Sequence, residues 1–165
     1  MNTEFEGLIR TLNAAGVEYI LVGGLAAIVH GSARATYDVD VVYARSPANI
    51  ERLARSLAPL EPYLRDAPPG LPFRFDAETI RRGLNFTLAT LLGSLDLLGE
   101  IAGGGSYEAL LPDTVTITLF AQECCCLSLD RLIDVKRAAG RPRDLAAIAE
   151  LEALREERRG RRDPR

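Results

Sequence analysis

The chain contains 165 residues, of which 47% are hydrophobic and 26% charged, and it carries a formal net charge of −3. This length favours one domain with its own hydrophobic core, and the acidic balance argues against indiscriminate binding to nucleic acid. The sequence has no apolar run long enough to span a bilayer and no export signal, so we expect a cytoplasmic protein that does not engage a membrane.

The N-terminal part predicts a helix, a strand, a glycine turn and a second helix. Apolar residues recur at helical spacing between residues 3 and 15, and Gly16 ends that pattern. The β-rich segment 17–22 stops abruptly at a pair of glycines, Gly23 and Gly24. A helix of about two turns is expected next, beginning near residue 25 and closing at Gly31.

Residues 36–43, TYDVDVVY, alternate in polarity as a half-buried strand requires. This alternation predicts that Asp38 and Asp40 lie on one face of the strand and that Val39 and Val41 lie on the other. Two like charges would then project from the same face with Cα atoms about 7 Å apart. Such an arrangement needs a physical reason.

The rest of the chain predicts four further strands and three helices. In order, these segments are a helix at 47–60, a surface loop or sheet edge at 65–76, two strands within 84–101 that separate at Gly93-Ser94, two strands within 114–128, and helices at 128–140 and 141–159. The last helix is expected to bury a stripe formed by Leu145, Ile148, Leu151 and Leu154.

These elements predict an α/β (α+β) fold in which helices flank a mixed central sheet. We expect a single domain over residues 1–165, with an α/β core at 1–127 and a C-terminal helical part at 128–165. From Arg131 onward the sequence has eleven basic and seven acidic residues, so its end is a basic tail. That tail is either a solvated helix end or a contact for phosphates.

Cys124, Cys125 and Cys126 are consecutive, which suits neither disulfide geometry nor a zinc site without a second ligand cluster. We interpret them as small apolar residues of a strand, because free cysteine is so often buried. A reactive thiol is the alternative interpretation.

Three aspartates in strand-like segments share one chemical explanation. Asp38 and Asp40 would raise each other's pKa in a half-buried site, and a bound divalent cation removes that conflict. Asp96, which stands among leucines in the second strand of 84–101, is costly to bury unless something pairs with it. A carboxylate triad suits Mg²⁺, which keeps coordination positions for substrate phosphates, with Mn²⁺ as the alternative ion.

The glycine pair fits the same chemistry. Gly23 and Gly24 let the main chain approach a phosphate, and the helix that follows presents unpaired N–H groups and the positive end of its dipole. Carboxylates for a metal beside a phosphate cradle indicate phosphoryl or nucleotidyl transfer.

The combination of GGLAAIVHG, RATYDVDVV and a later strand aspartate resembles the DNA polymerase β-like nucleotidyltransferase superfamily. Together with LSLDRLIDVKRAAGRPRDLAAI, it looks like the small prokaryotic nucleotidyltransferases grouped with the AbiEii toxins. The resemblance implies a nucleotidyltransferase fold. It covers the first two strands most strongly, the C-terminal helices less so, and residues 44–84 hardly at all.

The resemblance also implies a role for each matching residue. Gly23 and Gly24 match the turn that holds a nucleoside triphosphate, and Asp38 and Asp40 match the pair that binds two metal ions. Asp96 matches the third carboxylate, which in the family binds the catalytic metal and helps to deprotonate the attacking hydroxyl.

Several basic and polar residues are further candidates for nucleotide contact. Arg34 and Thr36 precede the acidic strand, and Arg34 either contacts a phosphate or pairs with Asp38 or Asp40. Lys136, the chain's lone lysine, either holds a phosphate or is an exposed helical residue. The arginines that follow it could extend a positive wall for an acceptor nucleic acid; they are Arg137, Arg141 and Arg143. His30, the lone histidine, is interpreted as a structural group rather than a base.

The first functional hypothesis is a metal-dependent transfer of a nucleoside monophosphate to an acceptor hydroxyl, on RNA such as tRNA or on a protein, as in toxin–antitoxin systems of the superfamily. A cognate toxin or antitoxin partner and a homodimer that completes the acceptor side are compatible with it. The alternative is a non-catalytic module of the same fold that binds a nucleotide or a partner protein. Aminoglycoside modification is a third candidate, which the small size of the chain disfavours.

Overall fold

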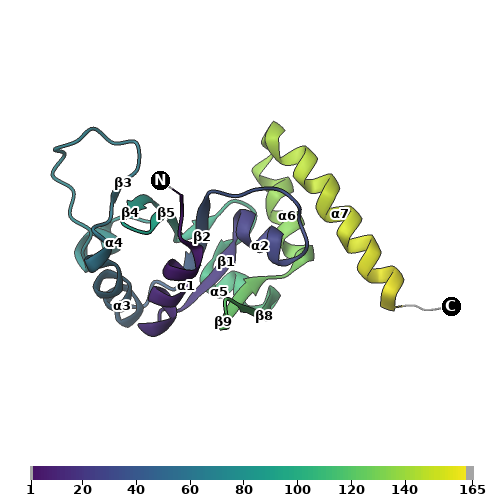
Figure 1. The fold of residues 1–165 in the computed structure, drawn as a ribbon, viewed down its shortest axis with the longest axis horizontal. Helices are drawn as coiled ribbons and strands as arrows, with labels where there is room; N and C mark the ends of the chain where they lie inside the picture. The colour runs from purple at the N-terminus through teal and green to yellow at the C-terminus, as the bar shows by residue number, and fades with distance from the viewer. Residues whose placement is uncertain (1, 163–165) are drawn as a thin grey trace.

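The computed structural model describes residues 2–162 and is built around a seven-stranded mixed sheet with helices packed against it (Figure 1). The spatial order of the strands is β3-β4-β5-β2-β1-β9-β8. Their bounds are β1 (Tyr19–Val22), β2 (Asp38–Tyr43), β3 (Tyr63–Leu64), β4 (Phe86–Thr90), β5 (Gly93–Leu98), β8 (Thr114–Leu119) and β9 (Gln122–Leu127). A separate pair is formed by β6 (Glu100–Ile101) and β7 (Gly105–Ser106).

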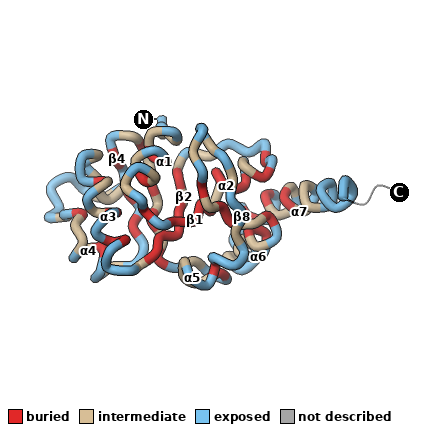
Figure 2. The backbone as a smooth tube through the Cα atoms, turned by 90° about the horizontal axis from the view of Figure 1, so that it is seen from below, coloured by how far each residue is buried: buried red, intermediate tan, exposed pale blue. Residues whose placement is uncertain are grey.

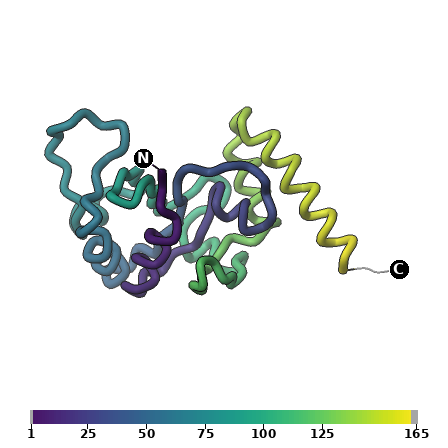
Figure 3. Tube along the Cα trace, in the orientation of Figure 1, coloured from purple at the N-terminus to yellow at the C-terminus, as the bar shows by residue number. Residues whose placement is uncertain are grey.

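Seven α-helices precede, connect or follow these strands within the described residues. They are α1 (Phe5–Ala14), α2 (Gly23–Val29), α3 (Pro47–Leu57), α4 (Ala77–Arg82), α5 (Tyr107–Leu110), α6 (Leu129–Ala139) and α7 (Pro142–Arg162). Ser46, Asp76 and Ser128 cap α3, α4 and α6 with their side-chain oxygens, and Gly140 ends α6 in the left-handed region with φ +63°. The C-terminal end of α7 extends away from the body of the molecule (Figure 3).

The centre of the sheet consists of β5, β2, β1 and β9. Strand β2 runs antiparallel to β1 and parallel to β5, and β1 runs parallel to β9. Strands β4 and β5 form an antiparallel hairpin, as do β8 and β9, and the edge strand β3 runs antiparallel to β4. The parallel pairing of β2 and β5 joins segments that lie more than fifty residues apart in the sequence, and it determines where the candidate site forms.

The hydrophobic core lies where the central strands meet the helices. Buried segments run through β1 and β2 in the middle of the molecule, while the loops and the end of α7 are exposed (Figure 2). Val39, Val41, Leu95 and Leu97 are fully buried, so one face of β2 and β5 belongs to the core. The alternate residues of the same strands therefore project from the opposite face.

The expectation of a mixed sheet flanked by helices is confirmed, as are the strands at 19–22, 38–43, 114–119 and 122–127. The expected buried stripe of the last helix is wrong at Leu145, which is 68% exposed. The rest of the stripe is confirmed, since Leu151 is buried and Ile148 and Leu154 are partly buried against the core, and Asp144 and Ala147 are buried in addition. The extreme end of the predicted basic tail, residues 163–165, lies outside the described residues.

The consecutive cysteines lie in β9, as expected. Cys124 and Cys126 are buried, and Cys125 is partly buried. Burial raises the pKa of the Cys126 thiol to about 12, so this group stays protonated and unreactive at neutral pH. Within residues 2–162, no helix is both long and apolar enough to cross a bilayer.

Candidate functional site

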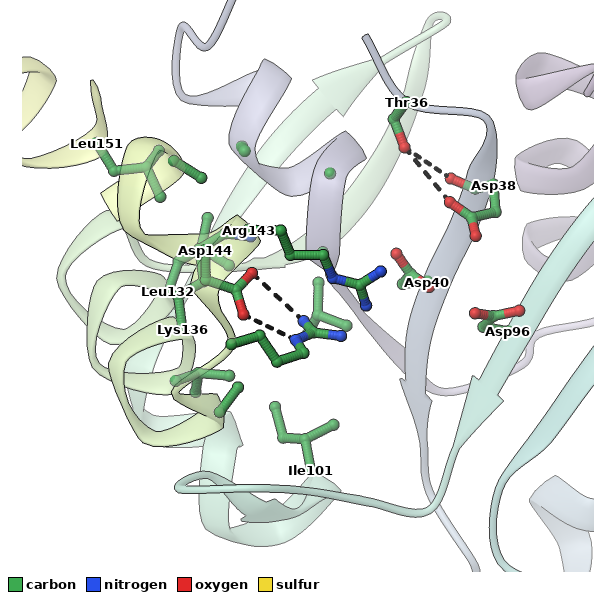
Figure 4. A pocket seen from close by; sticks show the side chains of 18 of the residues that line it. Thr36, Asp38, Asp40, Asp96, Ile101, Leu132, Lys136, Arg143, Asp144 and Leu151 are labelled. Carbon is green, nitrogen blue, oxygen red and sulfur yellow. Dashed lines mark hydrogen bonds and ion pairs between the residues drawn. The ribbon is translucent and has the colours of Figure 1, made fainter. Parts of the chain in front are cut away.

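Asp38, Asp40 and Asp96 converge on one face of the sheet. In the parallel pair, Asp40 lies opposite Asp96 and Asp38 lies opposite Ser94. Each aspartate alternates with buried valines or leucines, which forces all three side chains to the face opposite the core. One carboxylate oxygen of each residue lies within 4.8 Å of those of the other two. The predicted convergence of the three aspartates is therefore confirmed (Figure 4).

This triad could hold a divalent cation. It offers three carboxylate groups, the hard oxygen ligands that Mg²⁺, Mn²⁺ and Ca²⁺ accept, and all three are partly exposed rather than sealed in the core. The donor set excludes a preference for soft metals, which select sulfur ligands. The structure thus supports an acidic site for a hard ion without identifying that ion.

The surroundings of Asp40 disfavour a negative charge. Burial, followed by the like charge of Asp38, raises its pKa from 3.8 to about 6, although Arg65, the Gly24 N–H and Lys136 act in the opposite direction. A carboxylate held in this state gains more from a cation than one already stabilised by the protein.

Side chains of β2 and of the segment before it leave no room for a Cβ at Gly23 or Gly24. Gly23 has φ +67°, and a Cβ at this position would overlap the Asp40 carboxylate. A Cβ at Gly24 would lie 2.6 Å from the Thr36 hydroxyl oxygen. The Gly24 N–H already donates to Asp40. Helix α2 begins at Gly23 itself, earlier than expected, so the glycine pair brings the N-terminus of this helix directly against the acidic strand.

A cavity of about 720 Å³ opens beside the triad. Its walls come from the glycine turn, from β2 and β5, and from α6 and α7. Apolar side chains such as Leu132, Val135 and Leu151 line one part, and the three aspartates line another. The volume suits a ligand of nucleotide size.

Three basic side chains of the C-terminal helices and the turn between them also line this cavity: Lys136, Arg141 and Arg143. Figure 4 shows that Arg143 reaches into the cavity toward the acidic triad. Arg141 is held by Asp144, to which its Nε donates at 2.7 Å. Arg137 is absent from the cavity wall and pairs with Glu152, so the predicted positive wall includes Arg141 and Arg143 without Arg137.

Of the two candidates that precede the acidic strand, Arg34 and Thr36, only Thr36 contacts the triad. Thr36 and Arg34 line the cavity, and the Thr36 hydroxyl lies 3.5 Å from the Asp38 carboxylate. Arg34 makes no ion pair with Asp38 or Asp40 in the described residues. Its loop is fastened to α7 by Glu150, which accepts from the Ser32 hydroxyl and from the Ala33 N–H.

His30 is structural, as expected. Its Nε2 lies 2.7 Å from the Leu127 carbonyl, and its Nδ1 lies 3.1 Å from the Arg158 guanidinium, which requires the neutral ring with its proton on Nε2. Burial lowers its pKa. His30 therefore links α2 to β9 and α7 and takes no part in the triad.

Arg65 is the site residue that sequence reasoning missed. Its guanidinium contacts Asp38 at 3.3 Å and also pairs with Asp96. It follows the short strand β3 at the start of a proline- and glycine-rich loop, and the chain contains many arginines. The one sequence feature that could have indicated Arg65 is its place directly after a strand. That feature is weak evidence unless the pairing of this strand in the sheet is known.

A scan against protein-family models finds no match for this chain, and a search of curated proteins finds no matching sequence. Any statement about function therefore rests on the site itself.

Proposed function

We propose that the protein is a metal-dependent nucleotidyltransferase with the fold of the DNA polymerase β-like superfamily. The observation that carries this proposal is the convergence of Asp38, Asp40 and Asp96 at the mouth of a nucleotide-sized cavity with basic side chains on its far wall. Carboxylates and cationic groups on opposite sides of one cavity suit a substrate that is bound partly through metal and partly through phosphate oxygens.

Each residue then has a distinct role. Asp38 and Asp40 hold the metal of the incoming nucleoside triphosphate, and Asp96 completes the site on the neighbouring strand. When bound, divalent cations polarise the α-phosphate and neutralise charge on the leaving group. Lys136 and Arg143 contact phosphate oxygens from the α6–α7 side, and the apolar part of the cavity receives the nucleoside.

The reaction joins an acceptor hydroxyl to the α-phosphorus. The new P–O bond forms as the bridge to the β-phosphate breaks, and the electron pair of that bridge leaves with pyrophosphate. The hydroxyl proton passes to Asp96 or to water. The acceptor is an RNA or a protein side chain, because the cavity is filled by one nucleotide and a larger acceptor must approach from outside it.

The test uses the full chain with each of the four radiolabelled nucleoside triphosphates, Mg²⁺ or Mn²⁺, and total cellular RNA or protein as acceptor. We expect one fraction to become labelled and Asp40→Ala to lose the labelling while retaining its circular dichroism spectrum. Asp134→Ala, which removes an exposed acid of α6, is the matched control. Labelling that survives Asp40→Ala would overturn the proposal. Metal-dependent nucleotide binding without labelling would favour the non-catalytic module.

A further inference from the structure

Arg65 lies in the position from which a cation would contact two of the three aspartates. One terminal nitrogen lies 3.3 Å from Asp38 Oδ2, and the other contacts Asp96 Oδ1. Its side chain is 22% exposed, and the side chains of Asp38 and Asp96 are 34% and 20% exposed. The guanidinium thus bridges two carboxylates that belong to different strands.

The register of the sheet directs Arg65 to this place. Its N–H donates to the Thr87 carbonyl at 2.9 Å, which continues the β3–β4 pairing by one residue. Thr87 lies opposite Asp96, and Asp96 lies opposite Asp40. These four residues form one row across the sheet, so their side chains share a face. A slip of one residue in β3 would turn Arg65 to the other face.

The Arg65 guanidinium uses only part of its hydrogen-bonding capacity. The buried Arg65 Nε has no hydrogen-bond partner among residues 2–162, and both ion pairs of Arg65 come from its terminal nitrogens. Asp66 follows with φ +64° and begins a loop that ends at Asp76, the cap of α4. Arg65 can therefore leave the aspartates without breaking a packed helix or a central strand.

We propose that Arg65 is an internal counter-ion that competes with a divalent cation for Asp38 and Asp96. This inference rests on the metal site of the proposed function. A guanidinium and a metal ion would need the same carboxylates, and two cations in one site repel each other. Arg65 is in this sense a positioning residue: it holds the triad together without metal, keeps metal affinity low, and leaves when nucleotide phosphates bring additional ligands and charge.

The test measures Mn²⁺ binding to the full chain by electron paramagnetic resonance of free Mn²⁺, without nucleotide. We expect Arg65→Gln to tighten Mn²⁺ binding by roughly ten- to a hundredfold, because it removes one positive charge within a few ångströms of the ion. Arg65→Lys, which keeps the charge, should stay close to the wild type. Arg74→Gln is the matched control, since Arg74 lies in the same loop with a side chain that is 90% exposed.

The sign of the change separates this role from a purely structural one. If Arg65 only supported the fold of the site, its loss would weaken Mn²⁺ binding, and an affinity that is unchanged or weaker in Arg65→Gln overturns the proposal. A second measurement follows the wild type itself and uses Arg65→Lys only to assign the signal: titration with Mg²⁺ should shift the Arg65 Nε–H resonance, which is absent from the spectrum of Arg65→Lys, and leave that of Arg74 in place. An unmoved Arg65 signal at saturating Mg²⁺ also overturns it.

Failure of this inference is distinguishable from failure of the proposed function. Labelling of an acceptor together with unchanged Mn²⁺ affinity in Arg65→Gln removes the counter-ion role alone. A gain of Mn²⁺ affinity without labelling by any variant supports the counter-ion role and removes nucleotidyl transfer. No Mn²⁺ binding by any variant, with or without nucleotide, overturns both.

Discussion

Asp40 is placed where burial opposes its charge, and this predicts that the site costs stability in the absence of metal. Its pKa of about 6 in the folded state lies above the ordinary value of 3.8. The folded state therefore binds this proton more tightly than the unfolded state does. The ionised carboxylate destabilises the protein fully above about pH 6, and this cost disappears below pH 3.8.

We accordingly expect Asp40→Asn to stabilise the metal-free protein at pH 8 by about 1–2 kcal/mol. The melting temperature in the presence of a chelator should rise by roughly 2–6 °C at pH 8, and the gain should shrink as the pH falls from 6 to 4. Differential scanning calorimetry of both proteins between pH 8 and pH 4 measures this difference in melting temperature. A lower melting temperature for Asp40→Asn at pH 8 would mean that the contacts with Gly24, Arg65 and Lys136 outweigh burial.

Gly23 and Gly16 offer a matched pair that separates backbone strain from damage to the site. Both have positive φ, +67° for Gly23 and +69° for Gly16, but a Cβ at Gly16 would meet no atom of the described part of the chain within 4 Å, whereas one at Gly23 would overlap Asp40. Gly16→Ala should cost about 1 kcal/mol and leave Mn²⁺ binding intact. Gly23→Ala should cost about 2–4 kcal/mol and weaken Mn²⁺ binding, because Asp40 has to move. Equal Mn²⁺ affinities in the two variants would contradict the proposed reason for Gly23.

At the level of elements, the exposure of two leucines shows which face of α7 packs against the rest of the molecule. Leu151 is 1% exposed and Leu145 is 68% exposed, although both fit a helical stripe. Leu151→Ala should lower the free energy of unfolding by about 2–4 kcal/mol, whereas Leu145→Ala should change it by less than about 0.5 kcal/mol. Urea denaturation measures both. A large loss for Leu145→Ala would instead indicate that another surface covers this residue in solution.

The sequence predicted the elements whose pattern is local. Alternation identified β2, and the helix predicted at 128–140 corresponds to α6, whereas α2 begins at Gly23, before the predicted start near residue 25. Asp96 could be placed on the right face once β5 was recognised. The short strands β3, β6 and β7 and the short helices α4 and α5 were missed, since two to six residues carry little periodicity.

Arg65 was missed for a different reason. Its place in the site depends on three successive strand pairings, β3 with β4, β4 with β5 and β5 with β2, and none of these is encoded near residue 65. Leu145 was wrongly predicted to be buried, because apolar residues recur at helical spacing along more of α7 than the neighbouring elements cover. In both cases long-range packing decided what local pattern could not.

The molecule as a whole places the triad between two different environments. On one side lies the cavity enclosed by α2, α6 and α7, with Lys136 and Arg143 in its wall. On the other side, Arg65 and the exposed Thr87 and Ala89 lie on the sheet face of β3 and β4. Under the proposed function, the side that faces the cavity would receive the nucleotide, and the exposed side would leave room for an acceptor of any length.

This division predicts that residues on the two sides affect different ligands. Under the proposed function, Lys136→Gln should weaken binding of the preferred nucleoside triphosphate by about tenfold, equivalent to about 1.4 kcal/mol, because it would remove a cationic contact to phosphate. Without nucleotide, its Mn²⁺ affinity should change by less than about threefold, since Lys136 is the weakest of the groups that act on Asp40. Arg137→Gln is the control, because Arg137 is on the same helix and pairs with Glu152 away from the cavity. Isothermal titration calorimetry with and without nucleotide measures both affinities.

Arg65→Gln should give the opposite pattern, with a large change in Mn²⁺ affinity and little change in nucleotide affinity. If Lys136→Gln and Arg65→Gln instead changed the same affinity in the same direction, the triad would belong to one undivided site, and the nucleotide could not be assigned to the α6–α7 side.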